Sequence, residues 1–107
     1  MTASRQAFVD MANEAAKGFL QHGATRVVEC WGDDVPDGKV TDFRRSVQAT
    51  ADETVVFAWI EWPDRAARDA GMAAVMADPA MEPGPDGMPF DTGRMIFGGF
   101  VPVVEAG

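Results

Sequence analysis

The loop at residues 88–94 places an acid and an arginine just before an apolar segment. The planar guanidinium of Arg94 can bind a carboxylate or a phosphate through two parallel hydrogen bonds. Asp91 lies three residues earlier and can form an ion pair with this guanidinium instead. Arg94 is therefore a candidate for orienting an acidic ligand, although the spacing favours an internal Asp91–Arg94 pair.

Other reactive residue types occur without the partners that catalysis or metal binding requires. Residues 33–38 hold three aspartates, but Val35 and Arg44 stand where an EF-hand loop needs oxygen ligands, so we interpret this segment as a solvated turn. His22 is the single imidazole and follows a predicted helix, where a cation meets the carbonyl end of the helix dipole. Cys30 lies in a predicted strand with no nearby group to activate its thiol. The sequence therefore indicates no metal site and assigns no catalytic residue.

Two amphipathic helices are predicted to position these groups. Residues 4–21 carry apolar residues at i, i+3 and i+4 spacing, with Ser4 and Gly23 suited to the start and the end. Residues 66–77 follow Pro63 and place small apolar residues on one face, before an Asp-Pro pair that ends the helix.

Three segments rich in β-branched and aromatic residues are predicted to be strands, at residues 25–31, 54–62 and 94–104. A pair of glycines, Gly98 and Gly99, interrupts the last strand and indicates a bulge or a close backbone approach. Residues 41–47 are predicted to be a short helical turn or an irregular connection, and residues 32–38 and 82–87 to be loops. The order helix, strand, strand, helix, strand predicts an α+β fold.

Length and composition limit the class of protein. With 107 residues, of which 47% are hydrophobic, the chain can fill one core, so residues 1–107 are predicted to be a single domain. Lys and Arg total 9 against 17 Asp and Glu, and the net charge of −8 disfavours nucleic acid as a partner. No apolar run approaches the ~20 residues that a membrane span needs. We expect a cytoplasmic protein with no cofactor, no metal and no membrane partner.

The central predicted strand is apolar on both sides. Phe57 and Trp59 point to one face of the sheet because side chains alternate along a strand. Two helices can cover only one face, so the other face would leave an aromatic patch in water. A second copy of the sheet is the simplest cover, and burying two large aromatics per subunit contributes several kcal/mol at ~25 cal/mol per Å2. Alternatively, the loops at residues 32–51 and 78–93 fold back over this face.

Five segments resemble the YbaA-like bacterial family of unknown function (DUF1428), at residues 28–41, 52–60, 65–69, 88–91 and 94–100. The first segment, Val-Glu-Cys-Trp-Gly-Asp-Asp-Val-Pro-Asp-Gly-Lys-Val-Thr, and the last, Arg-Met-Ile-Phe-Gly-Gly-Phe, are the most specific. The family is a member of the dimeric α/β-barrel, ferredoxin-like superfamily. The resemblance therefore implies an antiparallel sheet with two main helices on one face, and a homodimer. It implies no activity.

The resemblance also implies an apolar strand before the first helix, and the sequence has no counterpart to it. In a ferredoxin-like sheet that strand is central, so its absence would leave its neighbours' backbone groups unpaired. The explanations are a start site assigned too late, a chain cut short, and a variant that closes the gap with its own or its partner's backbone. We favour the first, which N-terminal mass spectrometry of the natural protein would test.

Two functions remain open. The first is binding of a small apolar or acidic molecule, or cofactor-free catalysis, because related dimeric barrels such as small monooxygenases hold apolar ligands between sheet and helices. The residues predicted to line that site are Trp31, Phe57, Trp59, Arg94 and Phe97. The second is a non-catalytic interaction or stress-associated protein whose sheet face is only a dimer interface. A cavity of ~300 Å3 or more beside Trp59 would favour the first, and a packed interface the second.

Overall fold

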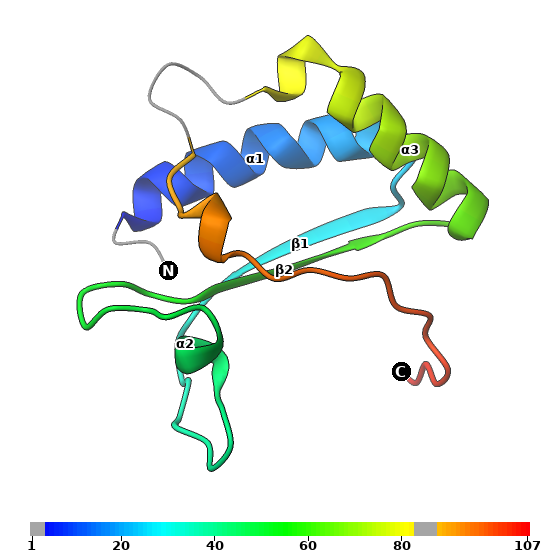
Figure 1. The fold of residues 1–107 in the computed structure, drawn as a ribbon. Helices are drawn as coiled ribbons and strands as arrows, with labels where there is room; N and C mark the ends of the chain where they lie inside the picture. Colours follow the sequence, from blue (N-terminus) through cyan, green and yellow to red (C-terminus); the bar gives the residue numbers. More distant parts are fainter. Residues whose placement is uncertain (1–3, 83–87) are drawn as a thin grey trace.

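The computed structural model describes residues 4–82 and 88–107 (Figure 1). Its elements are, in order, α1 (Arg5–Gln21), β1 (Arg26–Trp31), α2 (Phe43–Ser46), β2 (Val56–Glu61), α3 (Arg65–Ala77) and two 3-10 turns, η1 (Pro79–Met81) and η2 (Thr92–Arg94). The described residues therefore form an α+β structure with a two-stranded sheet, as the α+β prediction requires.

Side-chain caps set where the long helices start. The Ser4 hydroxyl accepts a hydrogen bond from the backbone N–H of Ala7 at 3.3 Å, and the Asp64 carboxylate accepts one from the N–H of Ala67 at 2.7 Å. The end of α1 is followed by Gly23, whose φ of 108° is in the region that favours glycine. Both predicted helices are confirmed, and of the two alternatives predicted for residues 41–47 the structure has the helical turn, as α2.

The two strands form an antiparallel pair. The register sets Arg26 opposite Glu61 at one end and Trp31 opposite Val56 at the other. Successive side chains of each strand point to opposite faces of the sheet. Both long helices lie on the same side of this sheet, so the sheet has a helix-covered inner face and an outer face (Figure 1).

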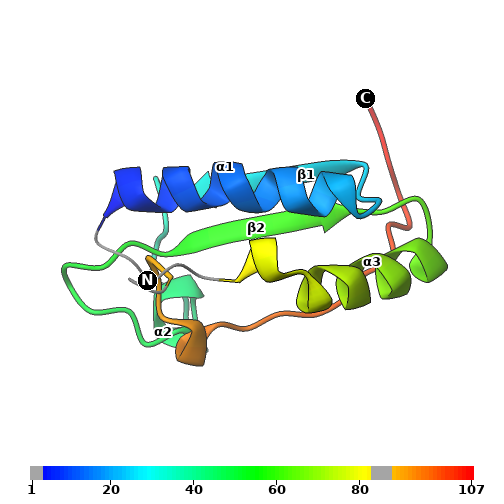
Figure 2. The same ribbon diagram turned by 90° about the horizontal axis from the view of Figure 1, so that it is seen from above.

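The helices pack on each other beside the sheet, as the view from above shows (Figure 2). A Cβ atom added at Gly71 of α3 would overlap the ring of Trp62 and approach the carbonyl oxygen of His22 to 2.8 Å, so glycine permits this close contact. The His22 imidazole, beyond the end of α1, contacts the Asp78 carboxylate at 2.8 Å. The core is small, with Phe8 and Ala12 of α1 among its buried residues.

The predicted strand at residues 94–104 does not form. The segment from Met95 to the C-terminus has no helix or strand and runs past α3, where Gly99 lies beside the Arg68 guanidinium (Figure 2). A strand needs a neighbouring strand to pair its backbone, and in the described residues the sheet consists of β1 and β2 alone, with which this segment does not pair. Most of its large apolar side chains are exposed, at fractions up to 91% for Val103. Apolar alternation alone was thus insufficient to make a strand.

The described residues contain neither a membrane-spanning helix nor a group of metal ligands. Across residues 4–82 and 88–107, no helix is both long enough and apolar enough to cross a membrane. Within the same ranges, no three His, Cys, Asp or Glu side chains are grouped closely enough to hold a metal ion. The predicted loop at residues 82–87 falls on residues 83–87, which lie outside the described residues.

Candidate functional site

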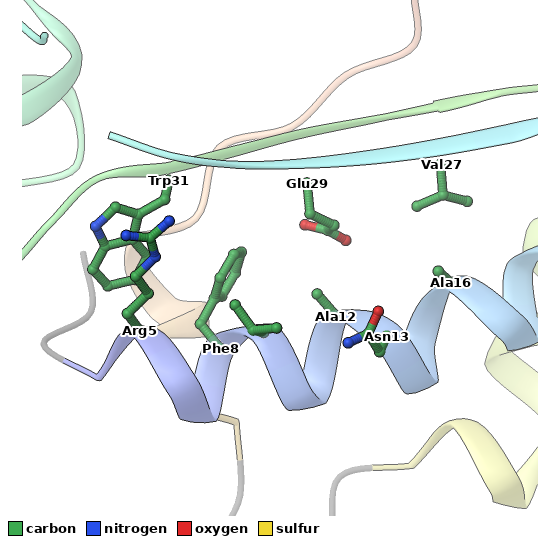
Figure 3. Close-up of a pocket in the computed structure, with 9 residues that line it drawn as sticks. Arg5, Phe8, Ala12, Asn13, Ala16, Val27, Glu29 and Trp31 are labelled. Carbon is green, nitrogen blue, oxygen red and sulfur yellow. The ribbon is translucent and has the colours of Figure 1, made fainter. Parts of the chain in front are cut away.

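An open groove runs between α1 and β1 (Figure 3). One wall is the row of α1 that contains Arg5, Val9 and Asn13, and the other wall is formed by the inward-facing residues of β1, which are Val27, Glu29 and Trp31. The floor is a second row of α1, Phe8, Ala12 and Ala16, which faces the sheet. The cavity has a volume of about 350 Å3, and its lining residues are Arg5, Phe8, Val9, Ala12, Asn13, Ala16, Val27, Glu29 and Trp31.

Small side chains on the helix create the hollow. Ala12 and Ala16 face β1 at the level of Glu29 and Val27, and their methyl groups do not reach the strand (Figure 3). The Phe8 ring instead packs against Trp31, with ring centroids 6.0 Å apart. The centroid of the Phe90 ring lies 6.4 Å from that of the same Phe8 ring. The groove therefore has a firm aromatic end and an open middle.

Glu29 points from the middle of β1 into this groove (Figure 3). Burial among apolar side chains raises the pKa of its carboxyl group above the ordinary value. Within the described part of the chain, no donor forms a hydrogen bond or an ion pair with this carboxylate. A carboxylate that is partly withdrawn from water and unpaired can accept a proton or a hydrogen bond from a ligand.

Two more polar side chains stand on the helical wall. Arg5 lies at the aromatic end beside Trp31, and Asn13 stands across the groove from Glu29 (Figure 3). Neither side chain has an ion pair or hydrogen bond with any residue in the described ranges. The groove thus presents a cation, an amide and a carboxylate around an apolar floor, which is the usual make-up of a small-molecule site.

The structure separates the five residues predicted to line one site. Trp31 lies in the groove, whereas Phe57 and Trp59 lie on the outer face of the sheet, opposite Cys30 and Val28 in the register. The cavity is therefore beside Trp31 and on the other face from Trp59. Phe97 is 90% exposed in the C-terminal segment. The predicted five-residue cluster does not come together because strand alternation sends Trp31 and Trp59 to opposite faces.

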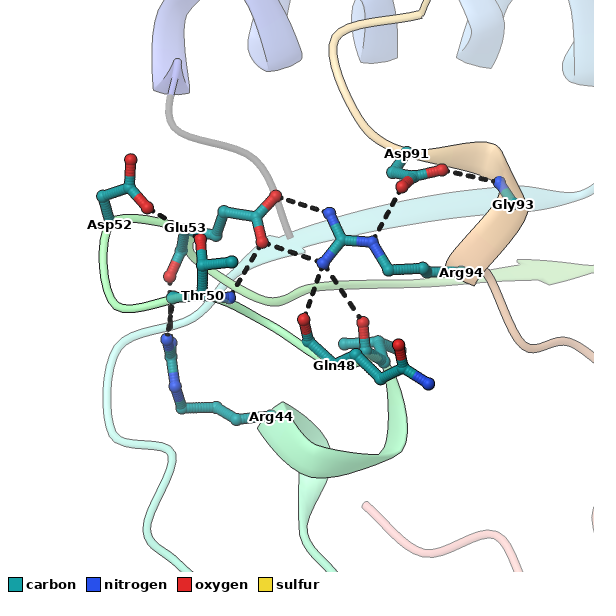
Figure 4. A network of polar contacts seen from close by, with 9 residues as sticks. Arg44, Gln48, Thr50, Asp52, Glu53, Asp91, Gly93 and Arg94 are labelled. Carbon is teal, nitrogen blue, oxygen red and sulfur yellow. Dashed lines mark hydrogen bonds and ion pairs between the residues drawn. The ribbon is translucent and has the colours of Figure 1, made fainter.

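Arg94 is held by the protein itself (Figure 4). Its two terminal nitrogens contact the two carboxylate oxygens of Glu53 at 2.9 and 2.6 Å, and its Nε donates to Asp91 at 2.8 Å. One terminal nitrogen also donates to the carbonyl oxygen of Gln48 at 2.7 Å. The predicted Asp91–Arg94 pair is confirmed, and it is joined by a bidentate partner that the sequence spacing did not reveal. Arg94 thus has few donors left for a ligand.

This network fixes the two loops that meet at the end of the sheet. Hydrogen bonds from Arg94, and then from the Thr50 backbone, lower the pKa of Glu53 to about 2. The bond from Arg94 also lowers the pKa of Asp91, and both acids raise the pKa of Arg94. Arg44 donates to the carbonyl oxygens of Glu53 and Thr50, which adds a second anchor (Figure 4). We assign Arg94 a structural role.

The outer face of the sheet carries an aromatic cluster. The Phe57 ring contacts Phe43 of α2 at 6.4 Å and Trp59 at 6.0 Å. Phe43 brings part of the loop at residues 32–51 onto this face, yet Phe57 remains 55% exposed and Trp59 40% exposed. At its rim, the Trp59 indole N–H donates a hydrogen bond to the Glu61 carboxylate at 3.0 Å. We call Phe43, Phe57 and Trp59 the outer aromatic cluster.

Reasoning from the sequence missed Arg5, Asn13 and Glu29. Alternation along β1 already places Glu29 on the same face as Val27 and Trp31. A charged residue between two apolar neighbours on an inward face is unusual, and that signal could have identified it. The choice of helical row could not be made from the sequence, because it depends on how α1 is rotated against the strand.

Comparison with known proteins places the chain in a family. The model of the family described as "Protein of unknown function (DUF1428)" matches residues 1–92. The protein named "Uncharacterized protein YbaA" from Escherichia coli (strain K12) is 50% identical over 101 residues, which cover 94% of this chain and 86% of that protein. The protein of the same name from Shigella flexneri matches to the same extent. The chain therefore belongs to the DUF1428 family of proteins of unknown function, together with YbaA.

Proposed function

We propose that this protein binds a small molecule in the groove between α1 and β1. The observation that carries the proposal is the unpaired Glu29 carboxylate, which faces an open cavity of about 350 Å3 between Phe8, Trp31 and Ala12, with no described partner. That volume lies at the lower end of the ~300–1,000 Å3 range of ligand pockets. Leaving a carboxylate unpaired among apolar side chains costs stability, and a ligand that donates a hydrogen bond would offset the cost.

The groove also suits chemistry that needs no cofactor. Glu29 is the lining residue best suited to take up and return a proton, because it faces the cavity and burial raises the pKa of its carboxyl group above the ordinary value. Among the described lining residues there is no serine, cysteine or lysine that could act as a nucleophile. The proposal is therefore binding, with acid–base catalysis by Glu29 as the one enzymatic extension that the lining supports.

A thermal-shift screen of small aromatic acids, lipids and quinones tests the proposal. The matched variants are Ala12→Leu, which fills the floor of the groove, and Ala7→Leu, an exposed position of the same helix. We expect some compounds to raise the Tm of the wild type and of Ala7→Leu, but not that of Ala12→Leu. A broad library that raises no Tm in the wild type would refute ligand binding.

The outer aromatic cluster favours a second role, in self-association. Phe43, Phe57 and Trp59 are neighbours, and each is at least 40% exposed. Together they form an apolar patch of the kind that marks protein interfaces. We propose that a second copy covers it, giving a homodimer in which two sheets pack face to face. In the interaction-protein alternative this interface is the whole function, and the groove stays empty.

The open edge of β2 bears on the architecture of the whole sheet. We propose a ferredoxin-like dimeric α/β barrel whose sheet includes a further strand along the open edge of β2. Three observations support it: β2 pairs only with β1 in the described residues, Ala58 on its inner face is exposed, and the apolar segment from Met95 to Val104 lacks a pairing partner there. A third strand would satisfy that edge. Hydrogen exchange at the β2 amides of the natural protein tests this, since protection throughout β2 is expected.

A further inference from the structure

The groove is polar in a defined order along its length. Arg5 and Trp31 stand at one end, Glu29 and Asn13 in the middle, and Ala16 and Val27 at the far end (Figure 3). Successive inward residues of a strand are about 6–7 Å apart, and one helical turn advances by about 5.4 Å, so the levels on the two walls stay roughly in step. A ligand would therefore meet a cation at one level and a carboxylate at the next.

Each level has its own chemistry. The Arg5 guanidinium is unpaired with any described residue and can bind a carboxylate through two parallel hydrogen bonds. The rings of Phe8 and Trp31, tilted by 49° at 6.0 Å, form an apolar surface next to it. Glu29 in its ionised form only accepts hydrogen bonds, so it selects a hydroxyl or an amine at its level.

We propose that the ligand is a small aromatic carboxylic acid with a hydroxyl or amino group at the opposite end of its ring. The acid would bind Arg5, the ring would lie against Phe8 and Trp31 above Ala12, and the hydroxyl or amine would donate to Glu29. This inference rests on the proposed function of the groove and adds the class of ligand. The two polar groups would be about 6–7 Å apart, which matches the spacing of levels on a strand and the length of a para-substituted ring.

Three probes separate the parts of this inference. 4-Hydroxyphenylacetate carries both groups, phenylacetate lacks the hydroxyl, and 2-(4-hydroxyphenyl)ethanol lacks the acid. Isothermal titration of each probe against the wild type should rank 4-hydroxyphenylacetate as the tightest binder. Loss of either polar group should weaken binding by about tenfold, as expected for hydrogen bonds to charged partners.

Variants identify which residue meets which group. Glu29→Gln should lower the affinity for 4-hydroxyphenylacetate by about tenfold. It should leave the affinity for phenylacetate unchanged, because phenylacetate has no hydroxyl to donate. Arg5→Gln should weaken both acids and leave the alcohol unchanged. Glu105→Gln changes charge at an exposed position of the C-terminal segment and should leave all three affinities as in the wild type. Circular dichroism confirms that each variant is folded.

The failure of the inference and the failure of the proposed function give different results. The ligand class would be overturned if the wild type bound the three probes with equal affinity. It would also be overturned if Glu29→Gln and Arg5→Gln each lost the same affinity for every probe. In both cases the groove would remain a binding site. If no probe binds, the ligand class is also wrong. In that case the function still stands when other library compounds stabilise the wild type but not Ala12→Leu, and it falls when none does.

Discussion

Glu29 of β1 and Trp59 of β2 lie on neighbouring strands but on opposite faces of the sheet. Trp59 is opposite Val28 in the register, whereas Glu29 is opposite Ala58 and points toward α1. The groove and the outer aromatic cluster are therefore separated by the thickness of a sheet. Substitutions at one site should leave the other intact, which allows ligand binding and self-association to be tested separately.

Replacing Glu29 with glutamine should stabilise the protein at neutral pH. The pKa of Glu29 is raised in the folded state, so its effect on stability is most favourable below the unfolded pKa and is lost as the pH rises through the folded pKa. Arg5 is the other charged residue that lines the groove. At pH 7 we expect Glu29→Gln to raise the free energy of unfolding by up to about 1 kcal/mol, a value discounted for partial exposure of the side chain. This corresponds to a rise of a few degrees in Tm. At pH 4 the gain should vanish.

Urea denaturation at both pH values measures this effect, with Glu105→Gln as the charge-matched control. An equal gain in the two variants would assign the effect to net charge rather than to burial of Glu29.

Filling the floor of the groove should block binding without unfolding the protein. Ala12→Leu adds apolar volume opposite Glu29, where the cavity is open, so its Tm should stay within a few degrees of the wild-type value. Ligands found in the screen should lose at least tenfold in affinity. Calorimetry on this variant and on Ala7→Leu checks the prediction, and equal binding to both would move the site away from the groove.

Removing the Arg94 guanidinium should loosen the loops at residues 47–53 and 91–94. Arg94→Ala deletes the contacts to Glu53, Asp91 and Gln48, and we expect a lower Tm with the groove affinity unchanged. Arg94→Lys should restore only part of the Tm, because lysine lacks the planar fork. Arg65→Ala at an exposed position of α3 is the control and should have little effect.

The same network predicts an acid transition. The pKa of Glu53 is depressed from 4.5 to about 2 in the folded state, so its stabilising effect is present above pH 4.5 and is lost as the pH falls toward 2. Thermal unfolding between pH 6 and pH 2 should show a steep fall in wild-type Tm, and a shallower fall in Arg94→Ala. Parallel curves would mean that Glu53 is not the group responsible.

A charge placed in the outer aromatic cluster should abolish self-association. Light scattering at micromolar concentration is expected to give twice the monomer mass for the wild type and the monomer mass for Phe57→Lys, because a buried unpaired ammonium opposes the interface. Met76→Lys, at an 80% exposed position of α3 on the opposite side of the sheet from the cluster, should remain dimeric. A monomeric wild type would contradict the homodimer.

The elements set by local patterns were predictable, and those set by distant partners were not. α1, β1, β2 and α3 follow from spacing and capping residues, which act within a few positions. The segment from Met95 to Val104 has the apolar pattern of a strand, but a strand also needs a neighbour, which local composition cannot report. Glu53 is far from Arg94 in sequence, so only the fold revealed that the arginine was already bound.

The most direct test of the account is to map a bound ligand by NMR. The compound that most raises the wild-type Tm in the screen would be titrated into 15N-labelled protein. We predict that backbone shifts concentrate on Ala12, Asn13 and Glu29, with the Trp31 indole signal also moving, while Phe57 and Trp59 stay unchanged. Shifts centred on Phe57 and Trp59, with none along α1 and β1, would contradict the assignment of the groove as the binding site.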